Sequence, residues 1–364
     1  MPHIHFEIRD GIYPLKVGGM EVFNYYFVRE LAKRIEVSYA AAAPLDHGYG
    51  RFSRMRSIKP IKYLAPIRFA FNALRHKPDM VILSFSAAHA VTWKLYGQSL
   101  SLLKIPYMTI IHHGKVPDNE NIEIYRKFFN DAKANIAVSE DIKRNYDAKY
   151  GIDCKVIPPL VPFEKSTRTR AELLSRYNLP AEGTLIGMVG TIKKMKNPDT
   201  LLKAIGIMTE EERKRYNPVA VFAGTGDEVE NLKKLAIELG IADRTRFVGF
   251  VPKEEVKDLM ACLDYYVIAS DYEGTSVSLL EAMYNRKPIL ASKVTGIKDT
   301  VSENEALFFE VRNPEQLKKQ LITFFENQSL REELSENAFK RYSRQYDYEV
   351  MIAQYLEVIS SCSK

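Results

Sequence analysis

A loop that follows an apolar stretch near the middle of the chain carries residues suited to hold a negatively charged ligand. It begins at Gly190 and reaches Lys196 six residues later, with Thr191, Lys193 and Lys194 between them. A glycine at a strand end lets the backbone approach a ligand closely, and a lysine ammonium is a compact charge that suits a diphosphate. The pattern therefore indicates a phosphate site, and the alternative is a solvated basic turn.

A second loop, again directly after an apolar stretch, contains two glutamates eight positions apart. Glu273 is followed by Gly274, which permits a tight turn, and Glu281 falls on the helix expected to begin there. The residues at the start of this helix are Thr275, Ser276 and Val277. Unpaired backbone N–H groups at a helix start suit a phosphate, and the two carboxylates could contact two parts of one extended ligand. Two ordinary surface charges are the alternative.

The composition indicates a globular protein of two domains. Its 364 residues are 46% hydrophobic and 27% charged, and one hydrophobic core rarely fills that length. The three cysteines are far apart, so neither a disulfide framework nor a structural zinc site is expected. Residues 1–9 do not resemble a signal peptide, and no apolar run approaches the roughly 20 residues that cross a bilayer. We therefore expect a cytoplasmic protein.

Positive charge is concentrated in the first half of the chain. Residues 1–162 hold 23 Lys and Arg against 15 Asp and Glu, whereas the remainder holds 29 against 31. Between His47 and Pro78 there are eight basic residues, no acidic residue and several aromatic ones. The stretch Arg51–Lys77 could face anionic lipid at the inner side of a membrane, an acidic acceptor or nucleic acid. A solvated helix and loop is the alternative.

Short apolar runs alternate with helix-length segments, which predicts an α/β fold with parallel sheets. The expected strands are 4–8, 37–42, 80–85, 107–111 and 135–138 in the first half, and 185–189, 219–223, 245–248, 265–269 and 288–291 in the second. Prolines between Val156 and Pro162 indicate a linker. We expect two doubly wound, Rossmann-like domains that face each other across a cleft, at 1–160 and 161–346. A last helix at about 347–362 is expected to pack back on the first domain.

Taken together, the motifs resemble those of the retaining glycosyltransferases of family 4. Besides the two loops, the ordered set includes Gly18-Gly19, His113-Gly114, Gly224-Thr-Gly226, the run from Arg246 to Val251, and the run from Pro288 to Ser292. Each motif is weak alone, but their order along almost the whole chain is specific. The resemblance implies the GT-B fold, a UDP-, GDP- or similar nucleotide sugar as co-substrate, and no other cofactor. It also implies a sugar or lipid-linked glycan acceptor, as in surface polysaccharide or glycolipid assembly.

The same resemblance implies roles for individual residues. The catalytic residues that it implies are His113, Lys196 and Glu273. The donor-binding residues that it implies are Gly18, Gly19, Gly190, Lys196, Val251, Glu273, Gly274, Thr275, Ser276, Val277 and Glu281. In this pattern Lys196 would bind the diphosphate, Glu273 the transferred sugar and Glu281 the ribose. His113 would lie near the reacting face of the sugar, and the Gly18-Gly19 loop would close over the phosphate.

One position departs from the family pattern. The family usually has an arginine where Thr191 stands, and Lys193 or Lys194 could replace it only as a point charge. No Asp-x-Asp motif occurs in the chain, so we expect no metal site for the donor.

Other classes of protein remain as alternatives. A GT-B sugar-nucleotide epimerase or a non-catalytic nucleotide-sugar-binding protein would share the fold and the donor pocket. A nicotinamide-dependent oxidoreductase would explain Gly224-Thr-Gly226 as the start of a dinucleotide fingerprint, but the third glycine of that fingerprint is missing. Only the basic stretch would favour nucleic acid, so we expect no nucleic-acid partner.

Overall fold

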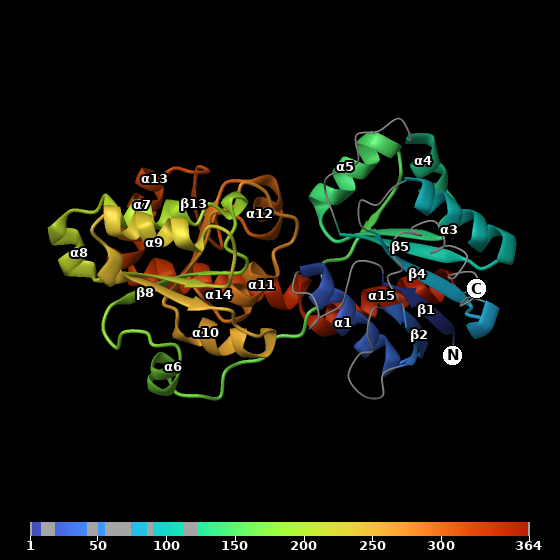
Figure 1. Cartoon of the computed structure of the whole chain (residues 1–364), viewed down its shortest axis with the longest axis horizontal. Helices are drawn as coiled ribbons and strands as arrows, with labels where there is room; N and C mark the ends of the chain where they lie inside the picture. Colours follow the sequence, from blue (N-terminus) through green and yellow to red (C-terminus); the bar gives the residue numbers. More distant parts are fainter. Residues whose placement is uncertain are drawn as a thin grey trace. The chain divides into compact units, whose positions relative to one another are not determined.

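The computed structural model describes residues 2–8, 19–41, 50–54, 74–85, 90–112 and 122–362. The chain divides into two compact units, of which unit 1 comprises Met1–Pro162 with Asp347–Lys364 and unit 2 comprises Phe163–Tyr346. Each unit has one parallel sheet with helices beside it (Figure 1). Within the described ranges, no helix has the length and apolar character to cross a bilayer.

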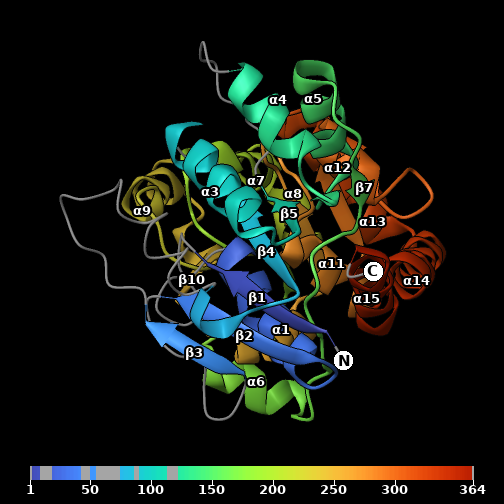
Figure 2. The same cartoon turned by 90° about the vertical axis from the view of Figure 1, so that its right-hand side faces the viewer.

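Unit 1 is built on a parallel sheet with the strand order β3-β2-β1-β4-β5-β6-β7. Its strands are β1 (His3–Glu7), β2 (Glu36–Ala41), β3 (Arg51–Arg54), β4 (Met80–Phe85), β5 (Tyr107–Ile111), β6 (Ala134–Ala137) and β7 (Lys155–Val156). Its helices are α1 (Gly19–Ala32), α3 (Ala90–Leu103), α4 (Ile122–Asn130), α5 (Glu140–Tyr150) and α15 (Tyr348–Cys362). Figure 2 shows β3, β2, β1, β4 and β5 side by side, so the order reverses between β1 and β4.

The last helix of the chain belongs to unit 1 because it packs on the first helix. The Tyr355 ring of α15 lies 4.8 Å from the Phe27 ring of α1, and the Tyr355 hydroxyl donates to the carbonyl oxygen of Ile157 at 3.3 Å. At the edge of this contact, Arg34 reaches the Glu349 carboxylate at 3.3 Å. The chain therefore returns to unit 1 after it has built unit 2.

Unit 2 has a parallel sheet with the strand order β10-β9-β8-β11-β12-β13. Its strands are β8 (Thr184–Val189), β9 (Pro218–Ala223), β10 (Thr245–Gly249), β11 (Tyr265–Ile268), β12 (Ile289–Ser292) and β13 (Leu307–Phe309). Its helices are α6 (Arg170–Arg176), α7 (Asp199–Gly206), α8 (Glu210–Tyr216), α9 (Val229–Glu238), α10 (Val256–Cys262), α11 (Val277–Tyr284), α12 (Thr295–Thr300), α13 (Pro314–Glu326) and α14 (Gln328–Gln345). The strand order reverses between β8 and β11.

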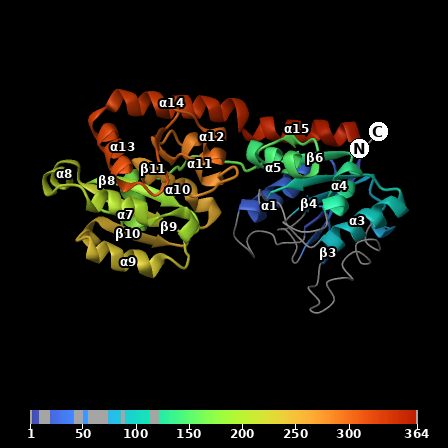
Figure 3. The same ribbon diagram turned by 90° about the horizontal axis from the view of Figure 1, so that it is seen from above.

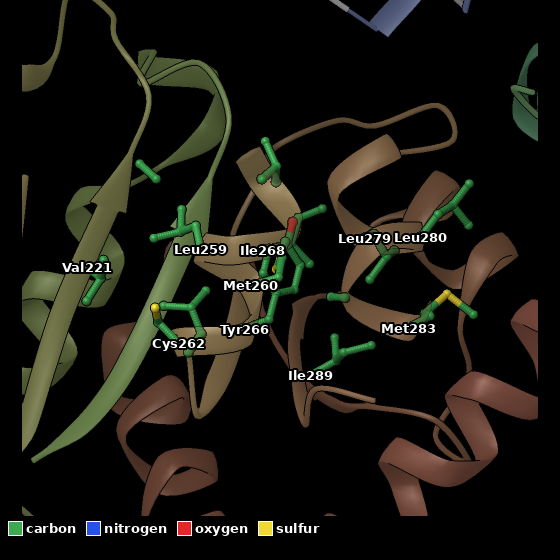
Figure 4. Close-up of a cluster of buried hydrophobic side chains, with 14 of the residues drawn as sticks. Val221, Leu259, Met260, Cys262, Tyr266, Ile268, Leu279, Leu280, Met283 and Ile289 are labelled. Atoms are coloured by element: carbon green, nitrogen blue, oxygen red, sulfur yellow. The ribbon is translucent and has the colours of Figure 1, made fainter. Parts of the chain in front are cut away.

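Two hydrophobic clusters cover the two faces of the unit 2 sheet. On one face, residues of α7, α9 and α13 pack on the strands, and these helices lie side by side in Figure 3. On the other face, α6, α10 and α11 pack with part of α14. Figure 4 shows part of this second cluster, which includes Tyr266 and Ile268 of β11 and Leu279 and Met283 of α11. The stretch from Leu279 to Met283 of α11 is therefore packed in the buried core.

The structure confirms the expected α/β class with two doubly wound sheets. All ten expected strands are present, with ends that differ by no more than one residue. The expectation missed β3, β7 and β13, which have four, two and three residues. β3 corrects the helix-and-loop interpretation of the basic stretch at Arg51–Arg54, because these residues pair in parallel with β2. β7 likewise includes Val156, which had been assigned to the linker.

Candidate functional site

The reversal of strand order in unit 2 places two loops at one point of the sheet edge. In doubly wound sheets, ligands bind outside the carboxyl ends of the strands where the order reverses. Here those strands are β8 and β11, which pair directly. The loop after β8 leads through the short 3₁₀ turn Lys194–Lys196 into α7, and the loop after β11 leads into α11.

The two loops meet through an ion pair. Lys196 Nζ contacts Glu273 Oε1, and the Ser270 hydroxyl donates to the same carboxylate oxygen at 2.7 Å. The Glu273 side chain is 11% exposed and that of Lys196 is 29% exposed, so the cation is the part of the pair that a ligand can reach more easily. The two residues that the sequence assigned to diphosphate and sugar are thus in direct contact.

Asn197 ties the same two loops together beneath the ion pair. It is buried, its backbone is left-handed with φ 45°, and its amide nitrogen donates to the carbonyl oxygen of Ala269 at 3.0 Å. The same nitrogen lies 2.5 Å from Asp271 Oδ1, and its amide oxygen accepts from Arg312 Nε at 3.0 Å. Arg312, which follows β13, also pairs with Asp271. Three loops are therefore joined by one polar cluster.

The glycines of the Gly224-Thr-Gly226 motif allow the loop after β9 to pack closely against the loop after β8. Gly224 has φ 141°, and a Cβ atom there would lie 1.8 Å from the carbonyl oxygen of Gly190. The Gly190 N–H in turn donates to the carbonyl oxygen of Ala223 at 2.9 Å. No side chain larger than hydrogen fits at Gly224, so packing against the β8 loop is a sufficient reason for this glycine.

The start of α11 leaves backbone donors without a side-chain cap. Ser276 is the N-cap residue, but its side chain makes no capping hydrogen bond and instead lies 3.2 Å from the Ser278 hydroxyl. The Tyr266 hydroxyl lies 2.8 Å from the same Ser278 oxygen. A helix end of this kind offers N–H groups and a positive dipole end to an anion. It lies in the loop that carries Glu273, so both can serve one ligand.

Glu281 is buried one turn into α11 and pairs with Lys253. The distance from Lys253 Nζ to Glu281 Oε2 is 2.8 Å, and the side chains are 10% and 4% exposed. Burial raises the pKa of Glu281 above its ordinary value, and the neighbouring Lys253 ammonium opposes that rise. The predicted ribose-binding carboxylate therefore already has a cationic partner.

Other predicted residues of unit 2 lie at the same edge with more exposure. Thr191, Lys193 and Lys194 are exposed in the loop after β8, and Val251 is half-buried directly after β10. Within the described ranges, no group of three or more His, Cys, Asp and Glu side chains is placed to hold a metal ion.

The predicted residues of unit 1 are only partly described. Gly19 is the first residue of α1, whereas Gly18 and His113 lie outside the described residues. The neighbouring His112 packs on the Phe23 ring at 4.8 Å, and burial lowers its pKa to about 3. Burial therefore favours the neutral form of the His112 imidazole.

Sequence reasoning missed two charged residues of this region. Lys253 follows Pro252 in the short loop after β10, and nothing in its spacing points to Glu281. Arg312 has φ 58°, a conformation that favours glycine, yet its guanidinium joins Asn197 and Asp271. Neither contact could be found in the sequence, because the partners are distant along the chain and meet only in the folded unit.

Family comparisons agree with the motif order. The model described as "Glycosyl transferases group 1" matches residues 169–341, and the model "Glycosyltransferase Family 4" matches residues 17–165. The two matches together run over most of both units. The lipopolysaccharide core biosynthesis glycosyltransferase LpsE of Rhizobium meliloti is 22% identical over 371 residues, covering 99% of this chain and 98% of LpsE.

Solved structures show the same fold. HepE from Anabaena, in complex with UDP, matches with a TM-score of 0.81 at 19% identity, covering 99% of this chain and 100% of HepE. A glycosyltransferase from Rickettsia africae matches with a TM-score of 0.85 at 18% identity, covering 100% and 99% of the two chains. The fold is therefore the GT-B fold.

The Asn197 cluster predicts a specific loss of stability. Asn197→Ala should reduce the free energy of unfolding by about 2–4 kcal/mol, because it removes buried hydrogen bonds and places alanine in a left-handed conformation. Asn178→Ala is the matched control: Asn178 has φ 51° and is exposed, so only the conformational cost of about 1 kcal/mol remains. Urea unfolding measures both, and equal losses would show that the cluster contributes nothing.

Proposed function

Because the chain belongs to family 4 of the glycosyltransferases, we propose that it moves a sugar from a nucleoside-diphosphate sugar to an acceptor with retention of anomeric configuration. The observation that carries this proposal is the contact between Lys196 and Glu273 where the order of β8 and β11 reverses. A cation that suits a diphosphate and a carboxylate that suits a sugar hydroxyl lie side by side there.

The chemistry that this arrangement supports is the departure of a nucleoside diphosphate. The bond from the sugar's anomeric carbon to the phosphate oxygen breaks, and negative charge grows on the diphosphate. Lys196 and the uncapped N–H groups at the start of α11 would stabilise that charge. Preorganised hydrogen-bond donors of this kind contribute much of the lowering of the activation barrier in enzymes. Unit 2 would therefore be the donor-binding domain.

The remaining roles follow the resemblance and rest on it. Glu273 would accept hydrogen bonds from the transferred sugar, and Glu281 from the ribose hydroxyls. Val251 would border the base, and His113 would lie near the reacting face of the sugar on the acceptor side. We infer a UDP-sugar as the first donor to test, because HepE was crystallised with UDP, and a GDP-sugar as the second.

The acceptor would bind to unit 1. A sugar or lipid-linked glycan in surface polysaccharide or glycolipid assembly fits the positive excess of that half, and LpsE acts in lipopolysaccharide core biosynthesis. Peripheral contact with an anionic membrane on its cytoplasmic side would involve Arg51–Lys77.

An epimerase or a non-catalytic binding protein would hold the same donor without transferring its sugar to an acceptor, so an assay of glycosidic product separates these candidates.

Lys196→Ala should reduce kcat/KM by about 100- to 1000-fold, since removal of one preorganised donor group costs about 2.7–4 kcal/mol in the barrier. Nucleotide sugars that raise the unfolding temperature identify the donor, and release of the nucleoside diphosphate then measures turnover. The matched control is Lys203→Ala, because Lys203 lies on α7 and pairs with Asp199 on the surface. A Lys196→Ala enzyme as active as the Lys203→Ala enzyme would contradict the role of Lys196.

Transfer should persist in the presence of a strong chelator. Lysine and helix-end N–H groups are proposed to hold the diphosphate, and the sequence has no Asp-x-Asp motif for a divalent cation. The measurement compares initial rates before and after EDTA treatment, with magnesium or manganese then added back. Activity that EDTA removes and a cation restores would show that the diphosphate is held by a metal instead.

Contact with an anionic membrane should depend on the basic stretch of unit 1. Exchange of Arg51, Arg54 and Arg56 for glutamate should abolish pelleting with anionic vesicles at low salt, because each basic residue near such a surface contributes about 1 kcal/mol. The matched control reverses the charge of three exposed lysines of unit 2, which are Lys214, Lys234 and Lys319. Neutral vesicles should bind neither protein. Wild-type protein that ignores anionic vesicles, or equal losses in both triple variants, would contradict this site.

A further inference from the structure

Lys253 is a largely enclosed cation beside the proposed donor site, and it has no assigned role. It begins the 3₁₀ turn Lys253–Glu255 after β10, two residues beyond Val251. Its ammonium reaches Glu281 Oε2 at 2.8 Å, and its side chain is only 10% exposed. Removing an ammonium from water costs free energy unless it is paired with an opposite charge. The contact with Glu281 therefore determines where the Lys253 ammonium lies.

A second contact fixes the lysine from another side. Lys253 Nζ lies 4.7 Å from the centre of the Phe163 ring, a geometry in which the ring face attracts a cation. Phe163 also packs on Tyr284 of α11 at 5.9 Å and on Tyr342 of α14 at 5.8 Å. The ammonium is therefore held between the helix that carries Glu281 and the first residue of unit 2.

The two oxygens of the Glu281 carboxylate have different surroundings. Oε2 is taken by Lys253, whereas Oε1 makes no hydrogen bond to any residue that the structure describes. We propose that Lys253 is a positioning residue of the donor site, which holds Glu281 by Oε2 and thereby presents Oε1 to the ribose hydroxyls. The inference rests on the proposed function, in which Glu281 binds the ribose.

The position of Lys253 also has a consequence for the charge of Glu281. Among the described residues, Lys253 and the Tyr266 phenol are the titratable groups that interact with the carboxylate. On the two helices packed against α11, Asp258 of α10 pairs with Arg168 and Glu336 of α14 pairs with Arg286. The other acids of α14, Glu332 and Glu333, are exposed. Without Lys253, burial would raise the pKa of Glu281 unopposed, and the protonated form would accept hydrogen bonds from ribose less well.

Calorimetric titration with UDP and GDP tests the proposal directly. For the nucleotide that wild-type protein binds more tightly, Lys253→Met should raise Kd by about tenfold or more at pH 7.5, the cost of losing an oriented, charged hydrogen-bond acceptor. The loss should grow as the pH falls to 5.5, and Lys253→Arg should recover most of the affinity. A dideoxynucleotide that lacks both ribose hydroxyls should bind the wild type and Lys253→Met with equal affinity.

Thermal unfolding separates this role from a general loss of structure. In Lys253→Met the folded-state pKa of Glu281 would lie further above its unfolded value, so its unfavourable effect on stability would grow as the pH rises from 5 to 8. The double variant Lys253→Met with Glu281→Gln should regain most of the lost unfolding temperature, because no unpaired charge remains buried. It should not regain nucleotide affinity.

The outcomes that would overturn the inference are distinct from those that would overturn the proposed function. Equal affinity of Lys253→Met and wild type for the nucleotide, or an equal loss for the dideoxynucleotide, would overturn the role of Lys253 alone. Wild-type protein that binds no nucleoside diphosphate would remove the proposed function and this inference with it.

Discussion

The reversal of strand order between β8 and β11 is the constraint on which the candidate site depends. These two strands are neighbours in the sheet, but the connections that follow them lead to helices on opposite faces. Space for a ligand opens at such a point because neither connection crosses it. Lys196 and Glu273 are 77 residues apart in the chain, and this reversal alone brings them together. A different strand order would separate the same motifs.

Contacts between charged or polar groups from different loops then hold the site in one geometry. Asp271 is joined to Asn197 and Arg312, so the loops after β8, β11 and β13 share one cluster. Glu281 is joined to Lys253 from the loop after β10. Loops are the more mobile parts of such folds. Hydrogen bonds and ion pairs between loops hold their side chains at fixed positions. The cost is that the buried groups among them, Asn197 and Glu281, depend on their partners.

The sequence predicts the fold better than it predicts the site. Buried parallel strands are continuous apolar runs, so ten of them could be placed to within one residue, whereas the short edge strands β3, β7 and β13 carry little of that signal. Lys196, Glu273 and Glu281 could be named from their motifs. Lys253 and Arg312 could not, because their partners on α11 and in the loops after β8 and β11 are distant in the sequence and meet them only in the folded unit. The assignments at Gly18 and His113 stay predictions, since both residues lie outside the described ranges.

The contact between Lys196 and Glu273 has a further consequence for how a donor can bind. The family usually supplies an arginine where Thr191 stands. Here the neighbouring Lys193 and Lys194 have exposed side chains. Lys196 is then the cation held in a defined place by its Glu273 contact. An ammonium has three donors, so it can keep the carboxylate and still donate to two phosphate oxygens. A guanidinium fork bound to the same carboxylate would have less freedom to do both. With the roles proposed for Lys196 and Glu273, the lysine would therefore connect the sugar-binding and phosphate-binding parts of the site without losing either contact.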